Sequence, residues 1–145
     1  MRPWPWEGVV QDAFADILRT ENWVIDRLAD TASHQRGIDV LAHKGNRKLG
    51  AEVKGFQFKD FTDPNRPGIK KTSPNGQAKT AFGKAIHAAL ILHDERPSWE
   101  SLIVLPDEPR YLALRSQVEK SLTVAGVHVV LVSEDGDYHC STWSP

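Results

Sequence analysis

Two acidic residues and one lysine in the middle of the sequence have types and spacing that suit metal-dependent chemistry. Asp39 lies in one short apolar segment, and Glu52 and Lys54 lie in the next. Gly45-Asn46 between them is typical of a two-residue turn that joins antiparallel strands. In the register that this turn sets, Asp39 falls directly opposite Glu52. Lys54 shares their face of the sheet, because side chains alternate along a strand.

Two carboxylates that face each other on a half-buried sheet repel, and a divalent cation would relieve this repulsion. Mg²⁺ prefers oxygen ligands and is commonly held by one or two carboxylates together with waters and substrate phosphate. We therefore expect Asp39 and Glu52 to bind Mg²⁺, with Mn²⁺ as its substitute and no small-molecule cofactor. With the ammonium group of Lys54 close by, this set suits phosphodiester hydrolysis. The alternative is an exposed sheet face with ordinary charges, because Glu-x-Lys is a common sequence.

Hydrophobic periodicity indicates the elements that must position these residues. Val10, Phe14 and Leu18 recur at helical spacing, which predicts a helix over residues 7–20. Continuous apolar segments such as 102–105 are typical of buried strands that are joined through helices. The expected strands cover residues 23–28, 38–42, 49–56, 102–105, 127–132 and 138–142, and two further helices cover 77–93 and 110–122. The sequence thus predicts one α/β domain over residues 1–145, a three-layer sandwich with a central mixed β-sheet flanked by helices.

The two chemical segments resemble the motifs of the restriction endonuclease-like superfamily, the PD-(D/E)XK nucleases. Gly37-Ile38-Asp39 resembles the first acidic motif, with Ile38 in place of the nominal proline, and Glu52-Val53-Lys54 matches the (D/E)-x-K motif. The turn between the motifs and the helix after them also fit the family. The resemblance implies a restriction endonuclease-like fold, in which Asp39 and Glu52 bind metal and Lys54 assists catalysis.

The resemblance also points to residues outside the two motifs. Many members carry a further glutamate on the first helix, and Glu7 fits that place, whereas its competitor Glu21 lies past the helix end. The alternative for Glu7 is an ordinary first-turn glutamate that the helix dipole favours. In some members a glutamine or lysine of the second helix borders the site, and Gln77 and Lys79 are the candidates. A polar helix start without a catalytic role is the alternative for both.

A basic segment lies between Lys44 and Lys84. It contains ten basic and three acidic residues, a net charge of +7 in a chain of net charge −1. Such a segment can hold a polyanion, and a solvated basic surface is the alternative. Within it, residues 57–76 are polar and rich in proline and glycine, which predicts a long loop that is either functional or disordered. The lysines that we expect to contact nucleic acid are Lys59, Lys70, Lys71, Lys79 and Lys84.

The composition restricts the cellular location and the kinds of site that we expect. The only cysteine, Cys140, excludes an intrachain disulfide and a cysteine-built zinc site, so a reducing, cytoplasmic location is expected. No apolar run approaches the roughly 20 residues that a membrane span needs. Residues 1–7 also lack the apolar stretch of a signal peptide.

The leading hypothesis is a DNA endonuclease that acts in repair, recombination or defence against foreign DNA. A homodimer would be needed for such a small chain to cut both strands together. One alternative is a non-catalytic nucleic-acid-binding or interaction module that retains the fold. Another is a structural or regulatory protein whose charges are incidental.

Overall fold

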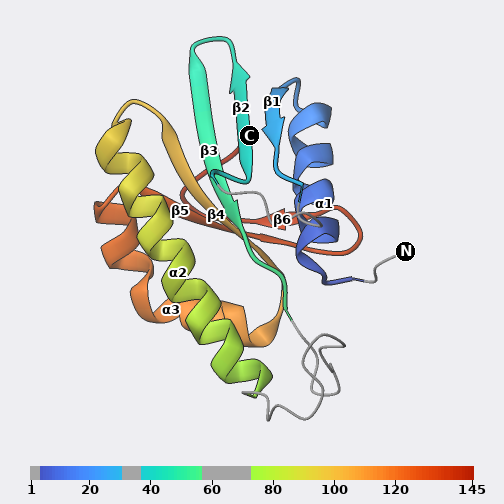
Figure 1. Cartoon of the computed structure of the whole chain (residues 1–145), viewed down its shortest axis with the longest axis vertical. Helices are drawn as coiled ribbons and strands as arrows, with labels where there is room; N and C mark the ends of the chain where they lie inside the picture. Colours follow the sequence, from blue (N-terminus) through green and yellow to red (C-terminus); the bar gives the residue numbers. More distant parts are fainter. Residues whose placement is uncertain (1–3, 31–36, 57–72) are drawn as a thin grey trace.

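The computed structural model describes residues 4–30, 37–56 and 73–145, which form a six-stranded mixed sheet flanked by three helices (Figure 1). The elements are α1 (Glu7–Thr20), β1 (Val24–Leu28), β2 (Val40–Lys44), β3 (Arg47–Val53), α2 (Pro74–Glu95), β4 (Glu100–Pro106), α3 (Pro109–Val124), β5 (Val127–Val132) and β6 (Tyr138–His139). This is an α/β three-layer sandwich, so the fold class that the sequence predicts is confirmed. None of the described helices is long and apolar enough to cross a membrane.

The strands lie side by side in sequence order, from β1 to β6. The first three are antiparallel, β3, β4 and β5 run parallel, and β6 is antiparallel to β5. The parallel strands are joined through α2 and α3, which lie together over one face of the sheet, while α1 covers the other face (Figure 1). We call these the α2 face and the α1 face. Because β4 is covered on both sides, all of its residues after Glu100 are buried.

Alternation along β3 decides which of its side chains can reach the candidate site. Leu49, Ala51 and Val53 are fully buried on the α1 face, where they join a core that includes Phe14 of α1. Glu52 is therefore turned to the α2 face. Burying a large apolar side chain stabilises the fold by about 1.5–3 kcal/mol. A one-residue slip of β3 would move Glu52 into this core, so the register is strongly specified.

The hairpin between β2 and β3 has the register that its turn predicts. Gly45 and Asn46 form a two-residue turn, and Gly45 has a φ of +58°, a left-handed conformation that glycine adopts without steric cost. Backbone pairing extends from this turn to Val40 and Ala51. It stops one residue short of Asp39.

Several strand boundaries differ from the expected ones. β2 begins at Val40 rather than at Ile38, and β3 ends at Val53 rather than at Phe56. Both changes lie at the same end of the hairpin, where contacts outside the regular β2–β3 ladder hold the chain, as described below. β6 is also shorter than expected, because it ends at His139.

The second helix, α2, is longer than the predicted range of 77–93. It begins at Pro74, whose fixed φ suits the first helical position. The hydroxyl of Ser73 caps the helix by accepting a hydrogen bond from the amide of Gly76 at 3.1 Å. Residues 57–72 hold most of the predicted loop and lie outside the described residues, as do three of the predicted nucleic-acid contacts, Lys59, Lys70 and Lys71.

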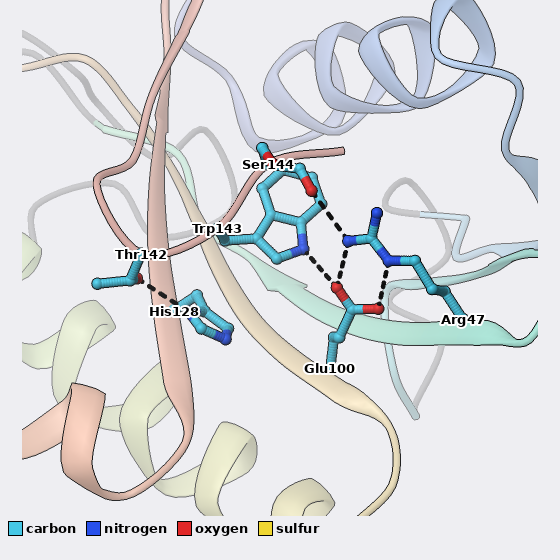
Figure 2. Close-up of polar contacts among 6 residues, drawn as sticks. All are labelled: Arg47, Glu100, His128, Thr142, Trp143 and Ser144. Atoms are coloured by element: carbon cyan, nitrogen blue, oxygen red, sulfur yellow. Dashed lines mark hydrogen bonds and ion pairs between the residues drawn. The ribbon is translucent and has the colours of Figure 1, made fainter.

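A polar cluster at the amino end of β4 holds the C-terminal segment against the sheet (Figure 2). Glu100 accepts hydrogen bonds from the guanidinium group of Arg47, at 2.5 and 3.0 Å, and from the indole of Trp143, at 2.9 Å. Arg47 also donates to the carbonyl of Ser144 at 2.9 Å. Glu52 lies near the opposite, carboxyl end of β3. We therefore assign this cluster to the stability of the fold and not to the candidate site.

Candidate functional site

The carboxyl groups of Asp39 and Glu52 lie at the same end of the β2–β3 hairpin, close enough that each shifts the pKa of the other. Asp39 lies one residue before β2, and Glu52 is the last residue but one of β3. Oδ2 of Asp39 also accepts a hydrogen bond from the backbone amide of Val53 at 2.8 Å. In a regular ladder, a backbone carbonyl of β2 would accept the hydrogen bond of this amide. Because the Asp39 carboxylate accepts it instead, regular pairing stops before Asp39. The structure thus brings the two residues together, as the turn register predicts.

Burial and charge raise the pKa values of both carboxyl groups. Burial is the main reason that the pKa of Glu52 rises to about 7, and the charges of Asp39 and Glu7 add to the effect, while Lys54 opposes it. Burial also raises the pKa of Asp39, against the opposing effects of a backbone amide and of two cations, Lys54 and Arg27. A half-buried pair of this kind favours a reduced negative charge, which either a proton or a bound cation can provide.

Lys54 follows β3 directly and supplies the ammonium group beside this acidic pair. Its backbone amide donates to the carbonyl of Val104 in β4 at 3.0 Å, which continues the parallel ladder one residue past the end of β3. Because side chains alternate, the Lys54 side chain lies on the face of Glu52. Its charge acts to lower the pKa values of Asp39 and Glu52, so the three groups are electrostatically coupled.

Arg27 of β1 is a second cation beside Asp39, and sequence reasoning missed it. Ile25 and Arg27 pair with consecutive residues of β2 although they are two apart in β1, which is a β-bulge. The extra residue reverses the alternation, so Arg27 pairs with Leu41 and joins the face of Asp39. Its Nε donates to the carbonyl of Ile38 at 3.0 Å, and its charge acts to lower the pKa of Asp39.

Glu7, the first residue of α1, lies near the acidic pair, although α1 covers the other face of the sheet. Its charge contributes to the raised pKa of Glu52. The backbone at Gly55 lies so close to the start of α1 that a Cβ there would be 2.6 Å from the backbone nitrogen of Glu7. Glu21, the competing candidate, is exposed at the opposite end of the helix. The structure therefore brings Glu7, and not Glu21, close to Glu52.

The candidates on α2 are placed differently from one another. Gln77 is half-buried near the start of α2, which is linked to the start of α3 by a hydrogen bond from Nε of Arg110 to the carbonyl of Asn75 at 3.4 Å. The start of α2 lies toward the end of the molecule at which β3 ends (Figure 1). Lys79 and Lys84 are exposed and are not among the charges that shift the pKa values of the two carboxyl groups. Both lysines therefore belong to the outer surface of α2, and a role for Gln77 at the site stays a prediction.

The donor set of this site fits a hard divalent cation. Among the residues that the structure describes, no group of three or more His, Cys, Asp or Glu side chains is arranged to hold a metal. Zinc sites usually need three or four protein ligands, whereas Mg²⁺ needs only one or two carboxylates and completes its shell with waters and phosphate. Asp39 and Glu52 could therefore hold a hard divalent cation, with waters and phosphate completing its shell.

Comparison with known proteins adds a distant likeness in backbone structure. No protein-family model matches the chain, and no curated protein matches it. A crystal structure of an XisH family protein from Nostoc punctiforme is similar, with 12% sequence identity and a TM-score of 0.49. The match covers 90% of this chain and 96% of that protein. A likeness at this level concerns the path of the backbone and not the chemistry of the site.

Proposed function

We propose that this chain is a metal-dependent nuclease that hydrolyses phosphodiester bonds in DNA, as an endonuclease. The observation that carries the proposal is the pair of half-buried carboxyl groups, Asp39 and Glu52, which lie close together at the end of the hairpin beside the ammonium group of Lys54. The resemblance of their segments to the PD-(D/E)XK motifs supports the same reaction class from residue type and spacing.

Asp39 and Glu52 would hold Mg²⁺, with Mn²⁺ as its substitute. Burial and the charge of Asp39 raise the pKa of Glu52 to about 7, so Glu52 holds a proton readily, and a divalent cation would displace that proton and relieve the repulsion. When bound, the metal polarises the phosphate and lowers the pKa of a bound water. Glu7 adds negative charge next to the pair and would favour the cation further.

Arg27 lies in β1 and Lys54 directly follows β3, so the two cations flank β2 and offset the negative charge of the site. Lys54 would stabilise the charge that develops on the phosphoryl oxygens as the phosphorus is attacked, an effect worth roughly a hundredfold or more in rate. Arg27 bonds the carbonyl of Ile38, the residue before Asp39, and would hold the Asp39 carboxylate in place. The DNA phosphates themselves would lie toward these cations.

A cleavage assay with matched variants tests the proposal. Supercoiled plasmid, linear duplex and branched DNA are incubated with wild type, Glu52→Gln and Glu134→Gln, in Mg²⁺, Mn²⁺ or EDTA. Glu134 is an exposed turn residue and controls for loss of one carboxylate and for contaminating nucleases. We expect wild type and Glu134→Gln to cut in either metal, and Glu52→Gln to be inactive.

Equal cutting by Glu52→Gln, or cutting in EDTA, would contradict the proposal. A wild type that binds DNA but cuts none of the substrates would favour a non-catalytic nucleic-acid-binding module instead. Direct appearance of linear plasmid without a nicked intermediate would indicate that two sites act together, as in a homodimer.

A further inference from the structure

A tyrosine of α3 holds the backbone immediately after Lys54. The hydroxyl of Tyr111 donates a hydrogen bond to the carbonyl of Gly55 at 2.7 Å. Tyr111 is completely buried, and its ring meets that of Phe56 edge to face, with centroids 5.9 Å apart. Through Tyr111, α3 thus contacts both residues that follow Lys54, although α3 begins more than 50 residues after the end of β3 in the chain.

The same two residues are held on another side by the start of α1. The amide of Phe56 donates to the carbonyl of Pro5 at 3.1 Å. A Cβ on Gly55 would lie 2.6 Å from the nitrogen of Glu7 and 2.7 Å from the carbonyl oxygen of Pro5, so only glycine permits this approach. Burial and, after it, the charge of Glu7 raise the pKa of Tyr111.

We propose that Tyr111 is a positioning residue for the nuclease reaction: by holding the Gly55 carbonyl, its hydroxyl fixes Lys54 and the Glu7-bearing start of α1 relative to each other. This inference rests on the proposed function. The aromatic ring alone would fill the core beside Phe56, but it would not set the orientation of the peptide group after Lys54. The directional hydrogen bond does so, as a supporting contact behind a catalytic group should.

Tyr111→Phe isolates the hydroxyl, because it keeps the ring and its packing. A displacement of about 1 Å in a catalytic group can lower a rate about a hundredfold. We therefore expect kcat for DNA cleavage to fall about tenfold to a hundredfold. The KM for DNA, and the DNA affinity measured by gel shift in Ca²⁺, should stay within about twofold of wild type, because the missing interaction acts on the transition state.

Ser101→Ala is the matched control. Ser101 is also completely buried, and its hydroxyl donates to the carbonyl of Ala89 at 2.7 Å, which ties β4 to α2. It lies at the amino end of β4, whereas Gly55 follows the carboxyl end of β3. Each substitution removes one hydroxyl-to-carbonyl hydrogen bond that links a helix to the sheet or to the segment just after it, so we expect comparable losses of Tm. Only Tyr111→Phe should lose kcat when both are assayed well below their Tm.

The possible results separate this inference from the proposed function. An active wild type with equal kcat in Tyr111→Phe and Ser101→Ala would overturn the inference and leave the nuclease assignment intact. A Tyr111→Phe chain that fails to fold, while Ser101→Ala folds, would make the tyrosine structural and would also overturn it. A wild type that cuts no DNA in any metal would overturn the nuclease assignment, and the inference would fall with it.

Discussion

The carboxylate of Asp39 accepts a hydrogen bond from the amide of Val53 at 2.8 Å, so this catalytic candidate is bound to the backbone between the other two, Glu52 and Lys54. Asp39 is also held through its own carbonyl, which accepts a hydrogen bond from the amide of Ala29 at 2.8 Å. The position of Asp39 therefore does not depend on a metal. Glu52 is acted on by the charges of three described residues, Asp39, Lys54 and Glu7.

Glu52→Gln and Asp39→Asn should each weaken Mn²⁺ binding without unfolding the protein. Each removes one of two carboxylate ligands, and even residues behind a metal ligand change affinity by about tenfold or more. Isothermal titration with Mn²⁺ measures the effect, with Glu134→Gln as the control. Unchanged affinity in both variants would mean that the metal binds elsewhere or not at all.

The metal-free protein should lose stability as the pH rises through neutrality because of Glu52. The pKa of this group is raised from 4.5 to about 7 in the folded state, so the folded state binds its proton more tightly than the unfolded state does. The resulting stabilisation is fully present below about pH 4.5 and is lost as the pH rises through about 7. Glu52→Gln removes this contribution.

Urea unfolding of wild type and Glu52→Gln in EDTA, between pH 5 and pH 8, measures this difference. We expect the free energy of unfolding of Glu52→Gln, relative to wild type, to increase with pH across this interval. A difference that does not change with pH would show that Glu52 titrates normally. In the same interval Mn²⁺ should bind more weakly as the pH falls, because protons compete for Glu52.

Lys54→Ala should abolish cleavage and leave metal and DNA binding largely intact. Its ammonium group acts mainly in the transition state, and removal of one preorganised charge of this kind lowers the rate by roughly a hundredfold or more. Binding should change little, because a single phosphate interaction is a small share of the electrostatic attraction of DNA. Plasmid cleavage in Mg²⁺ is compared with a gel shift in Ca²⁺. Equal cleavage rates in the variant and wild type would remove Lys54 from the catalytic set.

Lys79 and Lys84 on α2 are expected to contribute to DNA affinity by pairing with phosphates. Both are exposed, and so is Lys120 on α3, which serves as the control. Replacing Lys79 or Lys84 by Gln should reduce the slope of log affinity against log salt by about one unit for each lysine–phosphate pair that the substitution removes. Lys120→Gln should leave that slope unchanged. If all three variants keep the wild-type slope, DNA does not lie along α2.

The hairpin could be predicted from sequence because its information is local. Gly45-Asn46 sets the register of the turn, and the register brings Asp39 to Glu52. Glu7 could be placed for a similar reason, since the helical periodicity of α1 points its first turn along with Phe14 toward the sheet. Features of this kind depend on a few neighbouring residues.

Arg27 and Tyr111 could not be found in this way because their positions depend on contacts across the fold. Strict alternation places Arg27 on the face of Ile25, and only the bulge turns it toward Asp39. Tyr111 is typical of a core residue in a helix, and its hydroxyl reaches Gly55 only because α3 packs over the end of β3. The predicted ends of β2 and β3 near Asp39 were wrong for the same reason, because the Asp39 carboxylate takes the place of a backbone acceptor in the ladder there.

The bulge in β1 reverses the alternation of side chains between the two faces of the sheet for the residues after it. The extra residue is Asp26, which has no residue opposite it in β2. A chain without Asp26 would pair as a regular strand, with Ile25 still against the apolar core and Arg27 still on the charged face. One residue inserted after Arg27 would instead reverse the alternation a second time. Arg27 and Leu28 could then no longer both keep the faces of the sheet on which they now lie. Deletion of Asp26 should therefore be tolerated far better than an insertion one position further along.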